Sequence, residues 1–327
     1  MKNLLAKWLK RDGYEFNKVR KFLKMTPKEY RKLIVGLSNT VEQQMCDKKW
    51  SDIKYNHIPS VAMNKYRKAF LRNDSNRFNE YIENVKEGKD KINASVLFPH
   101  QLYKSYLNGE DKNSVEAQWN SLPNFMENSK DRIIPVCDVS GSMSGLPMEV
   151  SVSLGVYISE RNNSIFKDAF ITFSERPEIN YLTGSLYERF QQLKRANWGM
   201  NTNLEGVYKL ILDKAVENNL TEEDMPTKIL IISDMEFDSC IINKSEKSID
   251  MIKRMYMESG YKTPEIIFWN VNGRSGNVPA NKHEKNVGLV SGFSPSILKS
   301  ILQGKIETPE KLMLRTILNE RYDSIVI

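Results

Sequence analysis

The sequence predicts an α/β protein: a doubly wound, mainly parallel sheet preceded by an all-α domain of helical-repeat type. Two observations lead to this fold class. After residue 131, short continuous apolar runs alternate with helical stretches, a pattern typical of parallel sheets that helices cover on both faces. Before that residue, apolar residues recur at helical spacing. A chain of 327 residues has room for about two domains, and we expect a helical domain at 1–130 and an α/β domain at 131–327.

The helical domain contains one clear helix start. In the segment Thr26-Pro27-Lys28-Glu29, Thr26 can accept a hydrogen bond from the backbone of Glu29, and Pro27 occupies a position where a missing N–H costs nothing. Apolar residues at helical spacing predict further helices at about 41–48, 59–71, 78–85 and 99–107. Residues 108–114 read as a loop. Helices of this size in succession indicate a fragment of a HEAT-like α-solenoid, although no regular repeat can be counted.

The α/β domain shows the expected alternation. We expect strands at 132–138, 169–173, 228–234, 265–271 and 288–290. We expect helices at about 147–160, 186–195, 203–217, 246–258 and 295–302. Sheets of this kind bind ligands beyond the carboxyl ends of their strands, at the point where the winding direction reverses.

The formal net charge of +7 is unevenly distributed. Residues 1–130 hold 25 Lys and Arg against 15 Asp and Glu, whereas residues 131–327 hold 23 against 26. Aromatic residues stand among the basic residues of 1–70, and such a surface can bind a polyanion and stack bases. The alternative is that the charges are solvated helix faces and the aromatic residues form a core. The candidate polyanion contacts are Lys7, Lys10, Arg11, Lys18, Arg20, Lys21, Lys24, Lys65, Arg67 and Lys68.

Composition argues against a membrane or secreted protein. No window approaches the roughly 18 consecutive apolar residues of a membrane span, and lysines interrupt the start of the chain, where a signal peptide would have its apolar core. The three cysteines, Cys46, Cys137 and Cys240, are odd in number and widely spaced, so we expect neither a disulfide framework nor a CxxC metal site. We therefore expect a soluble, cytoplasmic protein that does not bind membranes.

Two of the predicted strands end in an aspartate, Asp138 and Asp234, at the edge where ligands bind. Asp138 begins the segment Asp-Val-Ser-Gly-Ser, whose small residues allow a tight turn, so its carboxylate and the hydroxyls of Ser140 and Ser142 can converge. Thr202 adds a hydroxyl in a second glycine-containing loop before a predicted helix. Oxygen ligands alone favour a hard cation, Mg²⁺ or else Mn²⁺ or Ca²⁺, over zinc.

These motifs resemble the metal-ion-dependent adhesion site of von Willebrand factor A (vWA) domains. The D-x-S-G-S segment, the later G-x-N-T-N-L segment and the strand ending in Ser-Asp fill all five positions of that site. The resemblance implies a Rossmann-like vWA sheet in which Ser140 and Ser142 bind the metal directly, and Thr202 does so directly or through water. It implies that Asp138 and Asp234 act largely through water. It further implies a vacant metal position for a carboxylate of an acidic protein partner, and therefore binding, not turnover.

Three segments also resemble an uncharacterised family that joins a helical region to a C-terminal vWA domain. They are Trp50–Phe70, Lys91–His100 and Ile232–Phe237. That family is similar in layout to the Ro (TROVE) ribonucleoproteins, in which a ring of helical repeats binds RNA, so the resemblance implies that the basic helical half faces RNA. About 130 helical residues are too few to close a comparable ring. Either the ring is absent, or several chains build it, or this chain is a shortened relative.

Three functions remain open. We favour a non-catalytic binding protein whose vWA metal site recruits an acidic protein partner and whose basic helical domain binds RNA. The second is a metal-dependent phosphohydrolase using Asp138 and Asp234, although Ser140 stands where an aspartyl-phosphate phosphatase would have its second carboxylate. The third is an assembly component that forms oligomers through its α/β domain. The sequence lacks nucleotide-loop and common hydrolase motifs, and its histidines, His57, His100 and His283, stand isolated.

Overall fold

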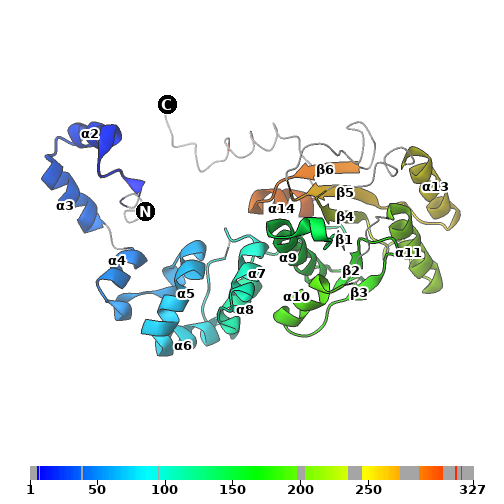
Figure 1. Cartoon of the computed structure of the whole chain (residues 1–327), viewed down its shortest axis with the longest axis horizontal. Coiled ribbons are helices and arrows are strands. Elements are labelled where there is room, and N and C mark those ends of the chain that lie inside the picture. Colours follow the sequence, from blue (N-terminus) through cyan, green and yellow to red (C-terminus); the bar gives the residue numbers. More distant parts are fainter. Residues whose placement is uncertain are drawn as a thin grey trace. The chain divides into compact units, whose positions relative to one another are not determined.

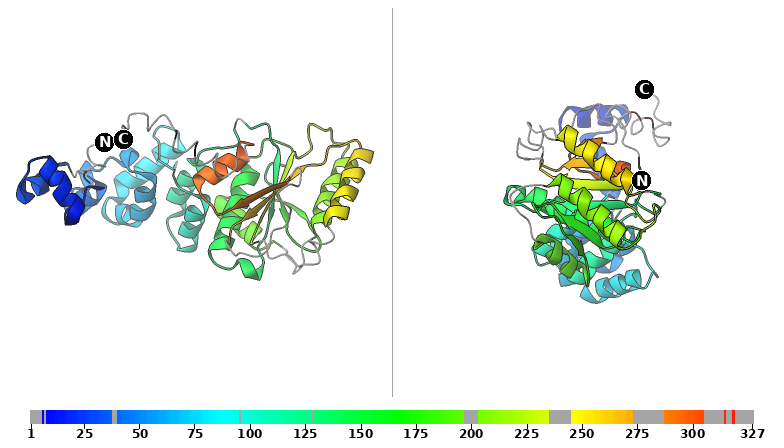
Figure 2. Two further views of the ribbon diagram at one scale, coloured as in Figure 1. Left: turned by 90° about the horizontal axis from the view of Figure 1, so that it is seen from above. Right: turned by 90° about the vertical axis from the view of Figure 1, so that its right-hand side faces the viewer.

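The contacts in the computed structural model divide the chain into two compact units, Met1–Ala94 and Ser95–Ile327 (Figures 1 and 2). The structure describes residues 6, 8–37, 40–94, 96–127, 129–196, 203–234, 245–272, 287–304, 314 and 318, with the backbone alone at 245–250. Among these residues, each helix is too short or too polar to cross a lipid bilayer.

The first unit is helical. Its elements are α2 (Gly13–Phe22), α3 (Pro27–Leu37), α4 (Val41–Cys46), η1 (Trp50–Asp52), η2 (Tyr55–His57), α5 (Ser60–Asn73) and α6 (Ser75–Lys86). The helices predicted after Thr26 and at about 41–48, 59–71 and 78–85 are confirmed to within a few residues. α2 is an addition, because the sequence pattern does not decide whether residues 1–25 fold or extend as an arm.

The predicted capping box at the start of α3 is present. The backbone N–H of Thr26 donates to Oε2 of Glu29 (2.7 Å), and the backbone N–H of Glu29 donates to Oγ1 of Thr26 (3.3 Å). Oγ1 of Thr26 also donates to Oε2 of Glu29 (2.7 Å), and the two bonds that Thr26 donates lower the pKa of Glu29, because they stabilise its charged form. α3 then buries Tyr30 and Ile34 against Phe16 of α2. The capping box therefore fixes the start of α3, the helix that supplies Tyr30 and Ile34 to this small hydrophobic cluster.

A second cluster is aromatic and centres on Tyr55. Its ring lies 5.3 Å from that of Phe70, 5.1 Å from that of Phe78 and 5.4 Å from that of Tyr81. Its hydroxyl donates to Oδ2 of Asp74 (2.6 Å), in the turn between α5 and α6. Aromatic pairs at these separations add stability beyond the area they bury. Tyr55 thus joins the short η2 turn to both long helices of the unit.

The second unit is an α/β layer structure, and the predicted fold class is confirmed. Its helices are α7 (Pro99–Leu107), α8 (Lys112–Asn120), η3 (Gly141–Met143), α9 (Leu146–Glu160), α10 (Leu186–Lys194), α11 (Leu204–Glu217), α13 (Ser245–Glu258) and α14 (Pro295–Leu302). Its strands are β1 (Ile133–Cys137), β2 (Ala169–Thr172), β3 (Ile179–Tyr181), β4 (Lys228–Ser233), β5 (Glu265–Asn270) and β6 (Val287–Ser291). Every predicted strand and helix of this half is present.

The six strands form one sheet in the order β3-β2-β1-β4-β5-β6. All neighbours are parallel except β2 and β3. From β1 the chain winds outward to β2, and from β4 it winds the other way to β5 and β6. The winding direction therefore reverses between β1 and β4, which is where open sheets of this kind bind ligands.

Helices cover both faces of the sheet. Figures 1 and 2 show α9 and α14 on one side and α11 and α13 on the other. On the α9 side, Gly155 allows the closest approach, because a Cβ there would lie 2.5 Å from Sγ of Cys137. Cys137 is buried against Gly155, and burial raises the pKa of its thiol, so its side chain contributes to packing. On the other side, α11 and α13 bury a continuous apolar cluster against β1, β2, β4 and β5.

Residues 95–130 belong by their contacts to the unit that contains the sheet, and α7 and α8 pack on its helices, although we expected these residues in the helical domain. α7 lies against α9 and α8 lies against α7, and Nε1 of Trp119 in α8 donates to Oε1 of Glu160 at the end of α9 (2.6 Å). The predicted loop at 108–114 is wrong beyond Asp111, which caps α8 by accepting from the N–H of Ser114 (2.7 Å). By its contacts, the second unit therefore begins near residue 95.

His100 lies at the start of α7. Its ring packs against those of Phe98 (5.3 Å) and Phe293 (5.4 Å), and burial, with a smaller effect from the charge of Lys104, lowers its pKa to about 4. Unfolded histidine takes up its proton near pH 6.5, so the stabilising effect of neutral His100 is full above that pH and is lost as the pH falls toward 4.

We therefore expect wild-type protein to lose more stability between about pH 7.5 and pH 5 than His100→Phe does, because the variant has no proton to take up. Urea unfolding of the full chain at both pH values measures this difference. Equal losses in the two proteins would contradict the assignment.

Candidate functional site

Asp138 and Asp234 lie close together at the carboxyl edge of the sheet. Asp138 follows β1 and Asp234 follows β4, and these strands are parallel neighbours with Cys137 opposite Ile232. The backbone N–H of Asp138 continues the ladder by donating to the carbonyl of Ile232 (3.0 Å). The sheet thus brings together two carboxylates that are far apart in the sequence, at the point where its winding direction reverses.

The carboxylate of Asp138 is held on both sides. The backbone N–H of Ser140 donates to its Oδ1 (2.9 Å), and Oγ of Ser233 donates to its Oδ2 (2.7 Å). Ser233 is the last residue of β4, so its hydroxyl fixes the Asp138 side chain across the two strands. No sequence pattern predicts this role of Ser233, although it precedes Asp234 in the Ser-Asp pair at the strand end.

The site has an excess of buried negative charge. Asp138 and Asp234 are both buried. Burial raises the pKa of Asp138, the hydrogen bonds from Ser140 and Ser233 partly oppose this, and the charge of Asp234 raises it again. Two like charges in a desolvated place destabilise one another. A bound cation would reverse that effect.

Two hydroxyls stand beside the carboxylates. Oγ of Ser140 and Oγ of Ser142 lie 3.0 Å apart, and either could donate to the other. Ser142 is exposed and Ser140 is partly exposed, whereas Met143 in the same η3 turn is fully buried. Gly145 then ends the loop with φ +88°, a conformation that favours glycine. The buried methionine anchors the loop and leaves both hydroxyls accessible to a ligand.

This donor set fits a hard divalent cation. Oxygens bound to Mg²⁺ at about 2.0–2.1 Å in an octahedron lie about 2.9 Å from their neighbours, close to the Ser140–Ser142 separation of 3.0 Å. The nearby carboxylates supply the charge that such an ion needs. In the described part of the chain, no group of three or more His, Cys, Asp or Glu could hold a metal. Hydroxyl and carboxylate oxygens suit a hard ion better than they suit zinc, which prefers nitrogen and sulfur ligands.

Thr202, the fifth predicted metal-site residue, lies outside the residues that the structure describes. Asn203, which follows it, is the N-cap of α11 and accepts from the N–H of Gly206 (2.8 Å). The backbone N–H of Asn203 donates to the carbonyl of Ser174, just after β2 (3.3 Å). The start of α11 is therefore attached to the carboxyl end of β2, the strand next to β1.

The predicted polyanion contacts lie in the first unit, around α2 and in α5. Arg67 requires a correction: it is only 1% exposed and donates to Oδ1 of Asn64 (2.9 Å), so it cannot meet a ligand at the surface. Arg20 is half-buried and donates to the carbonyl of Met25 (2.9 Å). Lys7 lies outside the described residues. The exposed candidates are Lys10, Arg11, Lys18, Lys21, Lys24, Lys65 and Lys68.

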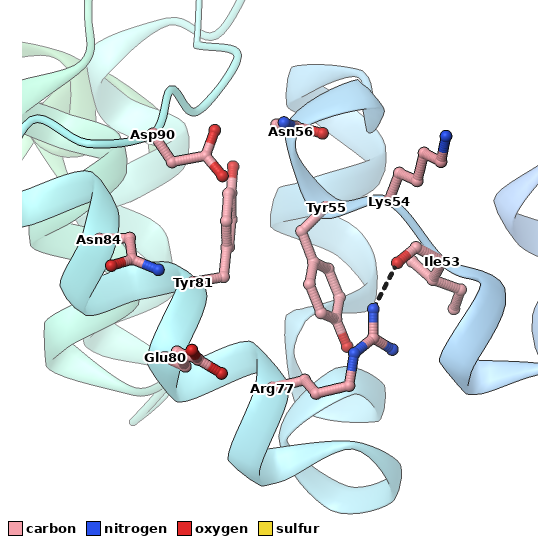
Figure 3. A pocket seen from close by; sticks show the side chains of 9 residues that line it. All are labelled: Ile53, Lys54, Tyr55, Asn56, Arg77, Glu80, Tyr81, Asn84 and Asp90. Atoms are coloured by element: carbon pink, nitrogen blue, oxygen red, sulfur yellow. Dashed lines mark hydrogen bonds between the residues drawn. The ribbon is translucent and has the colours of Figure 1, made fainter.

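A pocket of about 330 Å³ opens in the first unit between the η2 turn and α6 (Figure 3). Its lining residues are Ile53, Lys54, Tyr55, Asn56, Arg77, Glu80, Tyr81, Asn84 and Asp90. Arg77 donates to the carbonyls of Trp50 (2.8 Å) and Ile53 (2.9 Å), as Figure 3 shows for Ile53. Asn93 donates to the carbonyl of Ile58 (2.9 Å). These bonds fix the turn from both ends, which gives the Trp50–Phe70 segment a structural role.

Comparisons with known proteins place the chain as follows. The model of a family described as "Domain of unknown function (DUF7788)" matches residues 132–323, and one described as "Domain of unknown function (DUF2828)" matches residues 6–130. An uncharacterized protein of Acanthamoeba polyphaga mimivirus is 29% identical over 344 residues, which cover 96% of this chain and 60% of that protein. The chain therefore spans about three fifths of this curated relative.

A solved structure, the crystal structure of the Deinococcus radiodurans RO (RSR) protein, aligns with a TM-score of 0.47 and 13% identity. The alignment covers 93% of this chain and 74% of that one.

Proposed function

The chain belongs to the DUF7788 family, and we propose that its α/β unit is a non-catalytic, metal-dependent module that binds an acidic protein ligand. The observation that carries this proposal is the convergence of two buried carboxylates with a pair of hydroxyls 3.0 Å apart, at the reversal point of the sheet. The resemblance of the same residues to the adhesion site of vWA domains supports it.

Each residue has a distinct part in this proposal. Ser140 and Ser142 would hold the ion together with Thr202. Asp138 and Asp234 would supply charge and hydrogen bonds around the ion. Asp138 is placed for this, because Ser140 and Ser233 already hold its carboxylate. Mg²⁺, or else Mn²⁺ or Ca²⁺, would supply a positive centre with affinity for a carboxylate oxygen. Because hydroxyls carry no charge, they would leave the ion attractive to an external carboxylate.

The experiment tests whether binding requires both the carboxylates of the ligand and the metal ion. We expect the full chain to bind a fluorescent Glu-rich peptide in Mg²⁺, to release much of it in EDTA, and to bind it again when Mg²⁺ is restored. A Gln-rich peptide of the same length is the matched control. Binding of the Glu-rich peptide that remains in EDTA is attributed to the basic residues of the first unit. Identical binding of the Glu-rich peptide with Mg²⁺ and EDTA, or equal Mg²⁺-dependent binding of the Gln-rich peptide, would contradict the proposal.

A second activity, binding of RNA by the first unit, is favoured by its exposed lysines. Residues 1–94 contain twice as many Lys and Arg as Asp and Glu, and the exposed cations cluster around α2. Neutralised phosphates release counterions, so we expect RNA binding to weaken steeply with salt. Fluorescence anisotropy with a labelled RNA at several salt concentrations tests this. Absence of binding at low salt would contradict RNA binding.

A phosphohydrolase remains the alternative for the α/β unit. Asp138 and Asp234 at a strand edge could bind Mg²⁺ for phosphoryl transfer. However, Asp138 is held by two hydrogen bonds and is followed, two residues later, by Ser140. We therefore expect no Mg²⁺-dependent hydrolysis of p-nitrophenyl phosphate. Hydrolysis by wild-type protein that is lost in Asp138→Ala would favour the enzyme.

A further inference from the structure

The surface around α2 exposes three aromatic side chains. Trp8 is 75% exposed, Tyr14 is 80% exposed and Phe22 is 85% exposed. Isolated exposed aromatic residues are ordinary, but three within 15 residues expose a large apolar area on a short segment. Residues 10–24 also hold six Lys and Arg against two acidic residues. The segment therefore combines exposed rings with a local excess of positive charge.

The opposite side of α2 already has its packing partners. Phe16 lies edge-on against Tyr30 of α3, with 5.1 Å between ring centroids. The hydroxyl of Tyr30 donates to the carbonyl of Lys10 (3.3 Å), and the guanidinium of Arg20 donates to the carbonyl of Met25 (2.9 Å). These contacts fix α2 on α3 and determine which side faces outward. The exposed rings are thus presented by a helix that is held in place.

Rings and charges alternate on the outward side. A helix turns by about 100° per residue, which puts Tyr14, Lys18, Lys21 and Phe22 within one sector of about 100°. Lys18 lies between the two rings in this sector, Lys21 lies at its edge on the other side of Tyr14, and all four side chains are exposed. Lys10, Arg11 and Lys24 extend the positive charge at both ends of the helix.

We propose that this outward side of α2 is a stacking surface for single-stranded nucleic acid. The inference rests on the proposed RNA binding and specifies where, and to which form of RNA, the first unit binds. A single strand alternates phosphates with bases that have free faces, and proteins bind it with cations for the backbone and aromatic rings for the bases. A duplex keeps its bases stacked inside, so the exposed rings would have nothing to stack on.

The same features fit an anionic membrane less well. A helix that lies in a membrane surface separates an apolar side from a charged side. Here Lys18 lies between Tyr14 and Phe22 and Lys21 lies beside Tyr14, so burying both rings in lipid would also draw the two lysines toward the acyl chains. The alternation of rings and lysines therefore favours a single-stranded nucleic acid over a membrane as the ligand. Binding to vesicles is measured as the competing outcome of the test.

The test uses the full chain in EDTA, so that the metal site does not contribute. The probe is a labelled oligoadenylate of about 12 nucleotides, a length within the range that single-strand-binding modules cover. We expect Tyr14→Ala and Phe22→Ala each to weaken binding at least about fivefold, which corresponds to about 1 kcal/mol per ring. Neither should change the salt dependence. Lys21→Gln should instead lower the slope of log K against log salt by about 0.7.

The controls separate the inference from the broader proposal. Val35→Ala, at an exposed apolar position in α3 (68% exposed), should bind like wild type. Inorganic polyphosphate has charge but no bases, so Tyr14→Ala should bind it like wild type.

If wild type binds the oligonucleotide and both ring variants bind it equally well, the stacking inference fails while RNA binding stands. Binding to phosphatidylserine vesicles that competes with the oligonucleotide would also overturn the inference. If wild type binds no RNA at low salt, the proposed RNA binding itself fails.

Discussion

Replacing Asp138 with Asn is expected to weaken divalent-metal binding by about 10- to 100-fold, the cost typical of losing a residue that supports directly bound ligands. The variant keeps an oxygen to accept from the N–H of Ser140 and an amide that can donate to Oγ of Ser233, the two groups that hold Asp138 in place. It removes a buried charge whose pKa is raised by burial and by Asp234. The metal-free variant should therefore be at least as stable as wild type.

Opposite effects on metal binding and stability make this variant informative. Calorimetric titration with Mg²⁺ measures the first effect, and urea unfolding in EDTA measures the second. Ser144→Ala, at an exposed position just beyond the η3 turn, is the matched control and should bind Mg²⁺ like wild type. An Asp138→Asn protein that is unstable without metal, or that binds Mg²⁺ normally, would contradict the role given to this carboxylate.

Replacing Trp119 with Ala is expected to destabilise the second unit by about 3–5 kcal/mol, the range for removing a large buried aromatic side chain. Trp119 is 1% exposed, and its ring lies 5.1 Å from that of Phe190 and 6.2 Å from that of Tyr157. Its loss would also remove the hydrogen bond to Glu160, a mostly buried carboxylate whose pKa burial raises. Trp119→Phe, which keeps most of the apolar volume, should cost less.

This substitution tests whether α8 belongs to the α/β unit. Denaturant unfolding measures the loss of stability, and hydrogen exchange locates it. If α8 belongs to the α/β unit, exchange should rise in α9 and leave α5 and α6 of the first unit unchanged. An unchanged unfolding midpoint, or faster exchange confined to α5 and α6, would show that residues 95–130 fold with the first unit instead.

The strands of the sheet were predictable because each central strand is a continuous apolar run, as burial on both faces requires. β3 was not, because Ile179–Tyr181 has three residues, pairs on one side only and is half-exposed. α8 was missed because its first turn, Lys112–Ser114, is polar and follows a glycine-containing segment, so its cap at Asp111 resembled a loop. Short edge strands and polar first turns depend on tertiary contacts that a local pattern does not contain.

In the candidate site, too, the features set by the strands could be predicted and those set by tertiary contacts could not. Strand ends place Asp138 and Asp234 at one edge, so their proximity followed from the fold class alone. The support from Ser233 did not, because a serine at a strand end has many ordinary roles. The charge of Arg67 predicts a surface position, yet Arg67 shares the inward helical spacing of Met63 and Phe70, four residues before it and three after it. For Arg67, helical spacing predicts burial correctly, whereas charge does not.

The central claim is that the Asp138 loop binds one divalent ion, and equilibrium titration with Mn²⁺ followed by electron paramagnetic resonance tests it most directly, because free and bound ions give different signals. The account predicts saturable binding of one ion per wild-type chain, loss of that binding in Ser140→Ala/Ser142→Ala, and retention in Ser144→Ala. Undiminished binding in the double variant, or no saturable site in wild-type protein, would contradict it.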